Sequence, residues 1–356
     1  MRISIVGAGA MGSLMAGRLT LAAATPSPEA AGSSATRVDD LLLYGRPSPH
    51  LDAIQRRGLV LVERDGHART VPVRASSDPA EIEGSDVVLV LVKAWASAEA
   101  AAPLRSYLTR ETVVLTLQNG LGNAAALRSA LLHDGVRPHV WLGVTTHAAV
   151  RTEPGTIVHT GAGITAIGRR STEVTSRLRD IASALTSAGL QTVAVEDIHR
   201  WVWRKLAVNA AINPLTALAG VTNAAIDRDP DLHAAAESLA GEVVAVANAA
   251  GVTIDRQEVL AAVDAVARAT GENRSSMLVD LETGTRTEID AINGAVVAEA
   301  ARHRLKAPAN QLMTALVRAR ERGAGRLPVA DFPDAPDAPD APDAPDAPDD
   351  LVGVVA

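Results

Sequence analysis

Three polar side chains recur at four-residue intervals in a segment that is otherwise apolar. They are Lys205, Asn209 and Asn213, and in a helix this spacing places them on one face. Leaving such groups unpaired among apolar side chains costs on the order of 1–3 kcal/mol each. A cavity lined by one ammonium and two amides would suit an anionic, hydroxylated substrate. The alternative is that the amides cap neighbouring helices while the lysine extends its ammonium to solvent.

A second group of polar residues follows further along the chain. Asn273 and Ser276 stand where a helix is expected to begin, and Glu288 follows Thr287 at the expected start of another. Asn, Ser and Thr commonly cap helices, and a glutamate in the first turn is favoured by the helix dipole. On spacing alone, helix capping explains these residues without any chemistry.

A glycine-rich turn directly follows the first expected strand, residues 3–6, and precedes an expected helix, residues 13–24. Gly7 permits a tight turn, Gly9 lets backbone N–H groups approach a pyrophosphate, and Gly12 lets the helix pack against the strand. The turn consists of Gly7, Ala8, Gly9, Ala10, Met11 and Gly12. In this context it predicts a dinucleotide site, with the pyrophosphate at the positive end of the helix.

The second expected strand, residues 41–44, continues into Gly45 and Arg46 with no acidic residue at its end. In an NAD site, an Asp or Glu at this position accepts a hydrogen bond from the ribose 2′-hydroxyl. Arg46 instead offers a cationic fork suited to phosphate, so the dinucleotide is predicted to carry a 2′-phosphate. The alternative is that Arg46 is a solvated loop residue.

Residues 2–24 superficially resemble an export signal, because they are apolar and end in consecutive alanines. Cleavage would discard the phosphate-binding turn, and Arg18 interrupts the apolar run, so we reject this interpretation. No stretch is long and apolar enough to predict a membrane span. The absence of cysteine excludes disulfides and thiolate zinc sites, and no metal site is predicted. A cytoplasmic enzyme is expected.

Strand-like apolar runs alternate with helical stretches as far as about residue 195, and only helical patterns follow. We therefore expect an α/β fold with a Rossmann-type, doubly wound parallel sheet, followed by an all-helical C-terminal domain. The further strands are expected at 86–92, 113–117, 140–145 and 164–168, and the helices at 196–218, 231–250, 256–270, 275–282, 287–303 and 309–322. Ligands of such sheets bind beyond the carboxyl ends of the strands, where Lys93, Asn119 with Gly120, and residues 147–149 stand.

The formal net charge of −7 is concentrated in the last part of the chain. Repeated Pro-Asp-Ala there supplies seven aspartates, from Asp334 to Asp350, so the remainder is close to neutral and has no basic stripe for nucleic acid. The predicted domains are 1–195, with a surface insertion at 25–40, and 196–327. Residues 328–356 are expected to form a disordered acidic tail.

Taken together, these motifs resemble the 2-dehydropantoate 2-reductase (ketopantoate reductase) family over residues 1 to about 325. The resemblance rests on the glycine-rich turn, Lys93, Asn119-Gly, Thr-Thr-His147-Ala-Ala149, Lys205 with Asn209, Asn213 and Asn223, Asn273-x-x-Ser276, and Thr-Glu288-Ile-Asp-x-Ile-Asn-Gly. It implies a Rossmann domain for NADPH/NADP+ and a helical domain like the C-terminal part of 6-phosphogluconate dehydrogenase. The implied reaction is reduction of ketopantoate to pantoate, on the route to pantothenate and coenzyme A.

The resemblance also implies a role for each matching residue. Lys205 would be the general acid, and Glu288 its partner near substrate and cofactor. The implied substrate-binding residues are Asn119, Asn209, Asn213, Asn223, Asn273 and Ser276. The expected cofactor-binding residues are Gly7, Ala8, Gly9, Ala10, Met11, Gly12, Arg46, Lys93, Asn119, Ala149 and Glu288.

Hydride transfer from the nicotinamide to a 2-keto carbon leaves growing negative charge on the carbonyl oxygen, which a protonated lysine can stabilise and protonate. Burial disfavours a charged lysine, so a nearby carboxylate would help to keep it protonated. The expected partner is a small 2-keto acid, with neither nucleic acid nor membrane, and the protein is expected to be a monomer or homodimer. The alternatives are a related NADPH-dependent reductase of another 2-keto acid, or a non-catalytic NADP-binding regulator, which the presence of both Lys205 and Glu288 disfavours.

Overall fold

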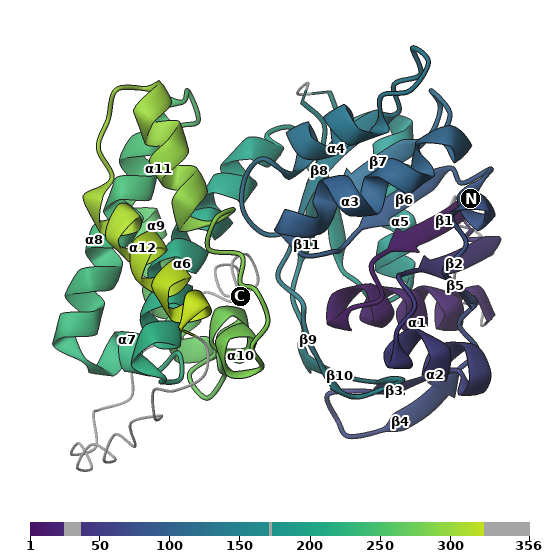
Figure 1. The fold of residues 1–356 in the computed structure, drawn as a ribbon, viewed down its shortest axis with the longest axis horizontal. Coiled ribbons are helices and arrows are strands. Elements are labelled where there is room, and N and C mark those ends of the chain that lie inside the picture. Colours follow the sequence, from purple (N-terminus) through teal and green to yellow (C-terminus); the bar gives the residue numbers. More distant parts are fainter. Residues whose placement is uncertain (25–36, 171–172, 324–356) are drawn as a thin grey trace. The chain divides into compact units, whose positions relative to one another are not determined.

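The computed structural model describes residues 1–24, 37–170 and 173–323. The chain divides into two compact units, Met1–Val202 and Trp203–Ala356. They are coloured from purple to teal and from teal to yellow in Figure 1. Most of the predicted 25–40 insertion and all of the predicted 328–356 tail lie outside the described residues.

The first unit is built on an eight-stranded sheet with the order β12-β11-β8-β7-β6-β1-β2-β5. Every neighbouring pair from β5 to β8 is parallel. The chain runs outward from β1 to β2 on one side and from β6 to β8 on the other, so the strand order reverses between β1 and β6. The strands are β1 (Arg2–Val6), β2 (Asp40–Tyr44), β5 (Ala75–Ser76), β6 (Val87–Val90), β7 (Val113–Thr116), β8 (His139–Thr145), β11 (Thr165–Gly168) and β12 (Thr192–Ala194).

The predicted doubly wound α/β fold is confirmed, with one correction to the sheet. Strand β11 was expected to be parallel like the others, but it pairs antiparallel with β8. Between these two strands the chain forms the antiparallel pair β9 (Ala148–Glu153) and β10 (Thr156–Gly161) instead of a crossover helix. Only a crossover returns the chain in the parallel sense.

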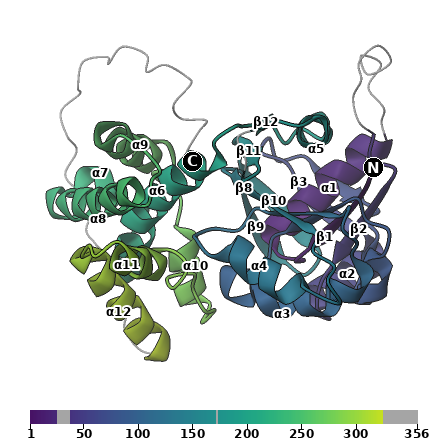
Figure 2. The ribbon, with the colours of Figure 1, turned by 90° about the horizontal axis from the view of Figure 1, so that it is seen from above.

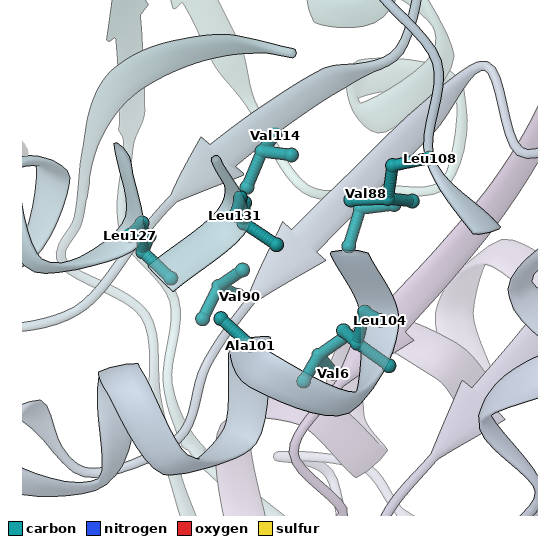
Figure 3. A pocket seen from close by; sticks show the side chains of 9 residues that line it. All are labelled: Val6, Val88, Val90, Ala101, Leu104, Leu108, Val114, Leu127 and Leu131. Atoms are coloured by element: carbon teal, nitrogen blue, oxygen red, sulfur yellow. The ribbon is translucent and has the colours of Figure 1, made fainter. Parts of the chain in front are cut away.

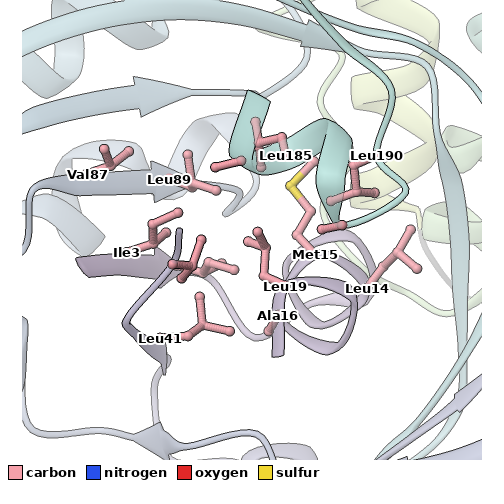
Figure 4. Close-up of a cluster of buried hydrophobic side chains, with 14 of the residues drawn as sticks. Ile3, Leu14, Met15, Ala16, Leu19, Leu41, Val87, Leu89, Leu185 and Leu190 are labelled. Atoms are coloured by element: carbon pink, nitrogen blue, oxygen red, sulfur yellow. The ribbon is translucent and has the colours of Figure 1, made fainter. Parts of the chain in front are cut away.

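Helices cover both faces of this sheet, because its strands alternate apolar side chains between two cores. On one face, Leu14 and Leu19 of α1 (Ala10–Ala24) and Leu185 of α5 (Ser176–Ser187) share a cluster with Ile3 and Leu89, as Figure 4 shows. The other face packs α3 (Ser97–Ala101) and α4 (Asn123–Leu131). Three short 3-10 turns, Pro79–Ile82, Ala94–Ala96 and Ala102–Tyr107, and α2 (Pro49–Arg57) complete the connections.

A small cavity in the second core has a purely apolar lining. Figure 3 shows side chains from strands β1, β6 and β7 facing side chains from the opposing helices. The nine lining residues are Val6, Val88, Val90, Ala101, Leu104, Leu108, Val114, Leu127 and Leu131, and all are buried. This cavity belongs to the packing of the core, since it offers no polar group to orient a ligand.

A second, four-stranded sheet was not predicted from the sequence. Its order is β4-β3-β10-β9, with β3 at Leu59–Val62 and β4 at Ala68–Val71. Helix α1 contacts β3, β9 and β10, and these elements lie side by side in Figures 1 and 2. A Cβ on Gly17 of α1 would lie 3.0 Å from Leu59 Cδ2. The helix that follows the glycine-rich turn is therefore enclosed between two sheets.

The second unit is all-helical in its described part. Its helices are α7 (Ala225–Arg228), α8 (Pro230–Ala249), α9 (Arg256–Ala269), α10 (Ser276–Glu282), α11 (Asn293–Arg302) and α12 (Pro308–Arg322), preceded by α6 (Ile198–Ala219), which begins in the first unit. None of the helices in the described residues is long and apolar enough to cross a membrane.

One predicted helix begins later than expected. Residues 287 and 288 are not helical, residues 289–292 form a turn, and α11 starts only at Asn293. The Thr287 hydroxyl accepts from the backbone N–H of Ile289 (3.2 Å) in a local turn, so Thr287 does not cap a helix. Asn293 anchors the helix start instead, donating to Ala210 O (3.0 Å) and Asn310 Oδ1 (2.9 Å).

Candidate active site

The glycine-rich turn has the geometry that the sequence predicted. Gly7 has a positive φ of 119°, and a Cβ there would lie 2.8 Å from Val92 N. A Cβ on Gly12 would lie 1.9 Å from Gly7 O, so the helix approaches the turn too closely for any side chain. In contrast, nothing lies within 4 Å of a Cβ on Gly9. Gly7 and Gly12 shape the turn, and the space at Gly9 fits a phosphate group approaching backbone N–H donors.

Arg46 follows directly after a residue that touches the turn. A Cβ on Gly45 would lie 2.8 Å from Ala8 Cβ, so the backbone at the end of β2 passes close to the phosphate loop. The Arg46 guanidinium pairs with Glu99 Oε1 at 3.2 Å, and both side chains are exposed, at 73% and 65%. Exposed pairs contribute little to stability, so a phosphate could compete with Glu99 for this guanidinium.

The loops after β6 and β7 begin at the same end of the sheet, because these strands are parallel and their carboxyl ends lie side by side. Lys93 precedes a 3-10 turn, and Asn119 O accepts from Asn123 Nδ2 at 2.8 Å. Gln118, which sequence reasoning missed, donates to Val92 O (2.9 Å) and to Ser97 Oγ (2.7 Å). Its position beside Asn119 at a strand end was the available signal. Gln118 holds the two loops together.

Ala149 lies in β9 opposite His159 of β10. It packs against the same apolar cluster as Ala8 and Met11 of the glycine-rich turn. The structure thus brings the predicted cofactor residues of the first unit, from the turn to Ala149, to one end of the sheet.

In the second unit, Lys205, Asn209 and Asn213 lie on one helix, α6, as the spacing predicted. Burial lowers the pKa of Lys205 from its ordinary value to about 8, and attraction to the Glu288 carboxylate partly opposes this shift. Glu288 is itself only 6% exposed. The structure therefore brings together the two residues expected to carry the chemistry, which lie 83 positions apart. A lysine with this pKa is still largely protonated at neutral pH and can release its proton readily.

Asn223 and Asn273 also lie together. The Asn223 backbone N–H donates to Asn273 O (3.0 Å), and its side-chain amide donates to Thr270 Oγ1 (2.8 Å). Asn223 Oδ1 is buried and has no hydrogen-bond partner among the described residues. An open groove beside them is lined by Thr222, Arg228, Arg268, Thr270 and Asn273, among others.

The capping interpretation of Asn273 and Ser276 is wrong. The N-cap of α10 is Ser275, whose Oγ accepts from Leu278 N (3.2 Å) and from Thr216 Oγ1 of α6 (2.8 Å). Ser276 is the first residue of the helix, and both it and Asn273 are exposed. Capping therefore does not account for these two side chains, and their role in substrate binding stays a prediction.

Comparison with known proteins agrees with this arrangement. The model of the family described as ketopantoate reductase PanE/ApbA matches residues 3–172, and that of its C-terminal domain matches residues 197–321. A 2-dehydropantoate 2-reductase of Halobacterium salinarum is 38% identical over 90% of this chain and 99% of its own length. One of Pyrococcus horikoshii is 34% identical over 90% and 98%.

Solved structures give the same answer. The crystal structure of a PanE/ApbA family ketopantoate reductase from Ralstonia eutropha JMP134 has a TM-score of 0.78 and 31% identity, covering 91% of this chain and 99% of that one. D-mandelate dehydrogenase, in a structure with NADH and anilino(oxo)acetate, shares the fold at a TM-score of 0.78 and 24% identity, with coverage of 91% and 99%. The relatives with this two-domain fold are reductases, which supports an oxidoreductase as the class of this protein. The chain belongs to the ketopantoate reductase family.

Proposed function

We propose that this protein reduces 2-dehydropantoate (ketopantoate) to (R)-pantoate with NADPH, in the cytoplasm, as a step of pantothenate and coenzyme A biosynthesis. The observation that carries the proposal is the half-buried Lys205 with the buried Glu288 as its electrostatic partner. The two family-model matches and the names of the relatives support the substrate. Arg46 and the absence of an acid at the end of β2 support NADPH over NADH.

The glycine-rich turn fits a bound dinucleotide, because the position of Gly9 offers open space beside backbone donors. Gly7, Ala8, Gly9, Ala10, Met11 and Gly12 would hold the pyrophosphate, with Arg46 on the 2′-phosphate and Lys93, Asn119, Ala149 and Glu288 as further contacts. Bound NADPH supplies the hydride that reaches the 2-keto carbon.

Lys205 has the proton-donor role in this proposal. Its ammonium stabilises the negative charge that grows on the keto oxygen and then gives that oxygen a proton. Glu288 opposes the effect of burial and keeps a larger fraction of Lys205 protonated. Asn119, Asn209, Asn213, Asn223, Asn273 and Ser276 would orient the substrate through its carboxylate and hydroxyl.

The experiment is an assay of NADPH oxidation with ketopantoate and with the same acid whose terminal hydroxyl is replaced by hydrogen. A site built to hydrogen-bond a substrate hydroxyl rejects the analogue that lacks it by up to ~10⁴–10⁵ in kcat/KM. Equal kcat/KM values would contradict the proposed substrate and favour reduction of another 2-keto acid. Absence of turnover with any 2-keto acid, combined with tight NADPH binding, would favour a non-catalytic regulator.

A further inference from the structure

A chain of buried and half-buried polar side chains in the first unit has no role in the proposed chemistry. It consists of Glu63 at the end of β3, Arg18 of α1, His159 of β10 and His147 in the turn between β8 and β9. Arg18 Nη2 donates to Glu63 Oε2 (2.6 Å) and to His159 Nδ1 (3.1 Å). His159 Nε2 lies 3.4 Å from His147 Nδ1, with the two rings 5.6 Å apart at their centroids. We call these four residues the histidine relay.

The partners in the relay determine where each imidazole carries its proton. A guanidinium can only donate, so His159 Nδ1 is an acceptor and the proton of a neutral His159 is on Nε2. That N–H donates to Gly161 O at 2.9 Å and also faces His147 Nδ1. His147 Nδ1 must then be unprotonated, which places the proton of His147 on Nε2.

The surroundings of both imidazoles disfavour their protonated forms. Burial lowers the pKa of His147 to about 4, helped by His159 and Arg18. Burial and the positive charge of Arg18 lower the pKa of His159 as well, although Glu63 opposes this. The side chains of His147 and His159 are 7% and 3% exposed. A hydrogen-bonded chain that ends in two buried imidazoles favours a single arrangement of the backbone segments that carry it.

The segments joined by the relay are those around the predicted cofactor site. Arg18 belongs to α1, the helix that begins in the glycine-rich turn. His147 is two residues before Ala149, and His159 is paired with Ala149 across β9 and β10. The relay therefore links α1 to two residues beside Ala149: His147, two positions before it, and His159, its partner on the paired strand.

We propose that the histidine relay holds the β8–β9 turn, and with it Ala149, at a fixed position relative to the glycine-rich turn, which makes His147 and His159 positioning residues for the cofactor. This inference rests on the proposed function, because it requires that the first unit binds NADPH. The working atom of His147 is Nδ1, which faces His159. Its Nε2 has no hydrogen-bond partner among the described residues.

Two substitutions of His147 distinguish the roles of its two ring nitrogens. Asn places an amide atom where Nδ1 stands, whereas Gln places one where Nε2 stands. We expect His147→Asn to keep the Kd for NADPH within about threefold of wild type. His147→Gln is expected to weaken binding about tenfold, in the range expected for one buried hydrogen bond. The KM for the 2-keto acid is expected to stay unchanged in both.

The matched controls are His139→Asn and His139→Gln, at the exposed first residue of β8, the strand that precedes His147. Both are expected to leave NADPH binding unchanged. Arg18→Met keeps an apolar stem but removes the donor to His159. The double variant Arg18→Met/His147→Gln is expected to bind NADPH about as weakly as the weaker single variant, because both changes break one relay.

The measurement is fluorescence titration of NADPH without substrate, on variants whose thermal unfolding remains cooperative. Tighter NADPH binding by His147→Gln than by His147→Asn would show that Nε2 is the working atom and overturn the proposal. Equal NADPH binding by the two variants would also overturn it. So would a loss of NADPH affinity in the double variant equal to the product of the two single losses. Failure of the wild-type protein to bind NADPH would instead contradict the proposed function, so the two failures are distinguishable.

Discussion

The two predicted halves of the active site are built from different parts of the polypeptide. At the carboxyl ends of the strands in the first unit, the predicted phosphate site is formed mainly by backbone. Its shape depends on residues with no side chain, such as Gly7 and Gly12. On α6 of the second unit, a row of side chains does the work, and burial sets the pKa of Lys205. We therefore expect added atoms to impair stability or NADPH binding in the first half, and removed side-chain atoms to impair catalysis in the second.

Lys205→Ala tests the second half and has the largest expected effect. Removing a positioned acid lowers kcat by roughly 10²–10⁴, and NADPH should still bind because its phosphate site lies in other residues. Lys306→Ala, at an exposed lysine of the same unit, is the control and should leave kcat unchanged. Steady-state assays and NADPH titration measure both. A near-normal kcat in Lys205→Ala would contradict the mechanism.

Adding one methyl group to the glycine-rich turn tests the first half. Gly12→Ala places a Cβ 1.9 Å from Gly7 O, and overpacking of this kind costs about 1–3 kcal/mol. Gly9→Ala meets nothing within 4 Å, so its stability should stay within about 0.5 kcal/mol of wild type while NADPH binding weakens. Thermal unfolding and NADPH titration separate the two. Equal stability of the two variants would contradict the packing role of Gly12.

Arg46→Glu sharpens the comparison at a cofactor position of the first half where a side chain, not the backbone, is predicted to make the contact. Like charge beside the 2′-phosphate should weaken NADPH by about tenfold or more and leave NADH nearly unchanged. Glu99→Gln, which removes the present partner of Arg46, should tighten NADPH binding slightly. The ratio of kcat/KM for the two cofactors reports both changes. An unchanged ratio in Arg46→Glu would remove Arg46 from the site.

Sequence patterns predicted the features that depend on local periodicity. The i+4 spacing of Lys205, Asn209 and Asn213 predicted their shared helix, and the glycine spacing predicted the turn after β1. Apolar runs such as 113–117 predicted the central strands, because strands buried on both faces contain few polar residues.

The patterns failed where distant residues decide the structure. Thr287 looks like a helix cap, but the helix starts only at Asn293, whose amide reaches Ala210 O and Asn310 Oδ1. The four-stranded sheet beside α1 pairs β3 with β10, which are almost one hundred residues apart in sequence. Likewise, the contact of His147 with His159 depends on this second sheet, so neither histidine could be assigned a partner in advance.

The pH dependence of kcat/KM in the wild type and in Glu288→Gln tests the central claim most directly. The protonated form of Lys205 is the donor, and its pKa is about 8, so kcat/KM should fall as the pH rises through about 8. Glu288 raises the pKa of Lys205, so Glu288→Gln should move this fall to lower pH. A wild-type profile that stays flat between about pH 7 and 9, or a fall that does not move in Glu288→Gln, would contradict the account.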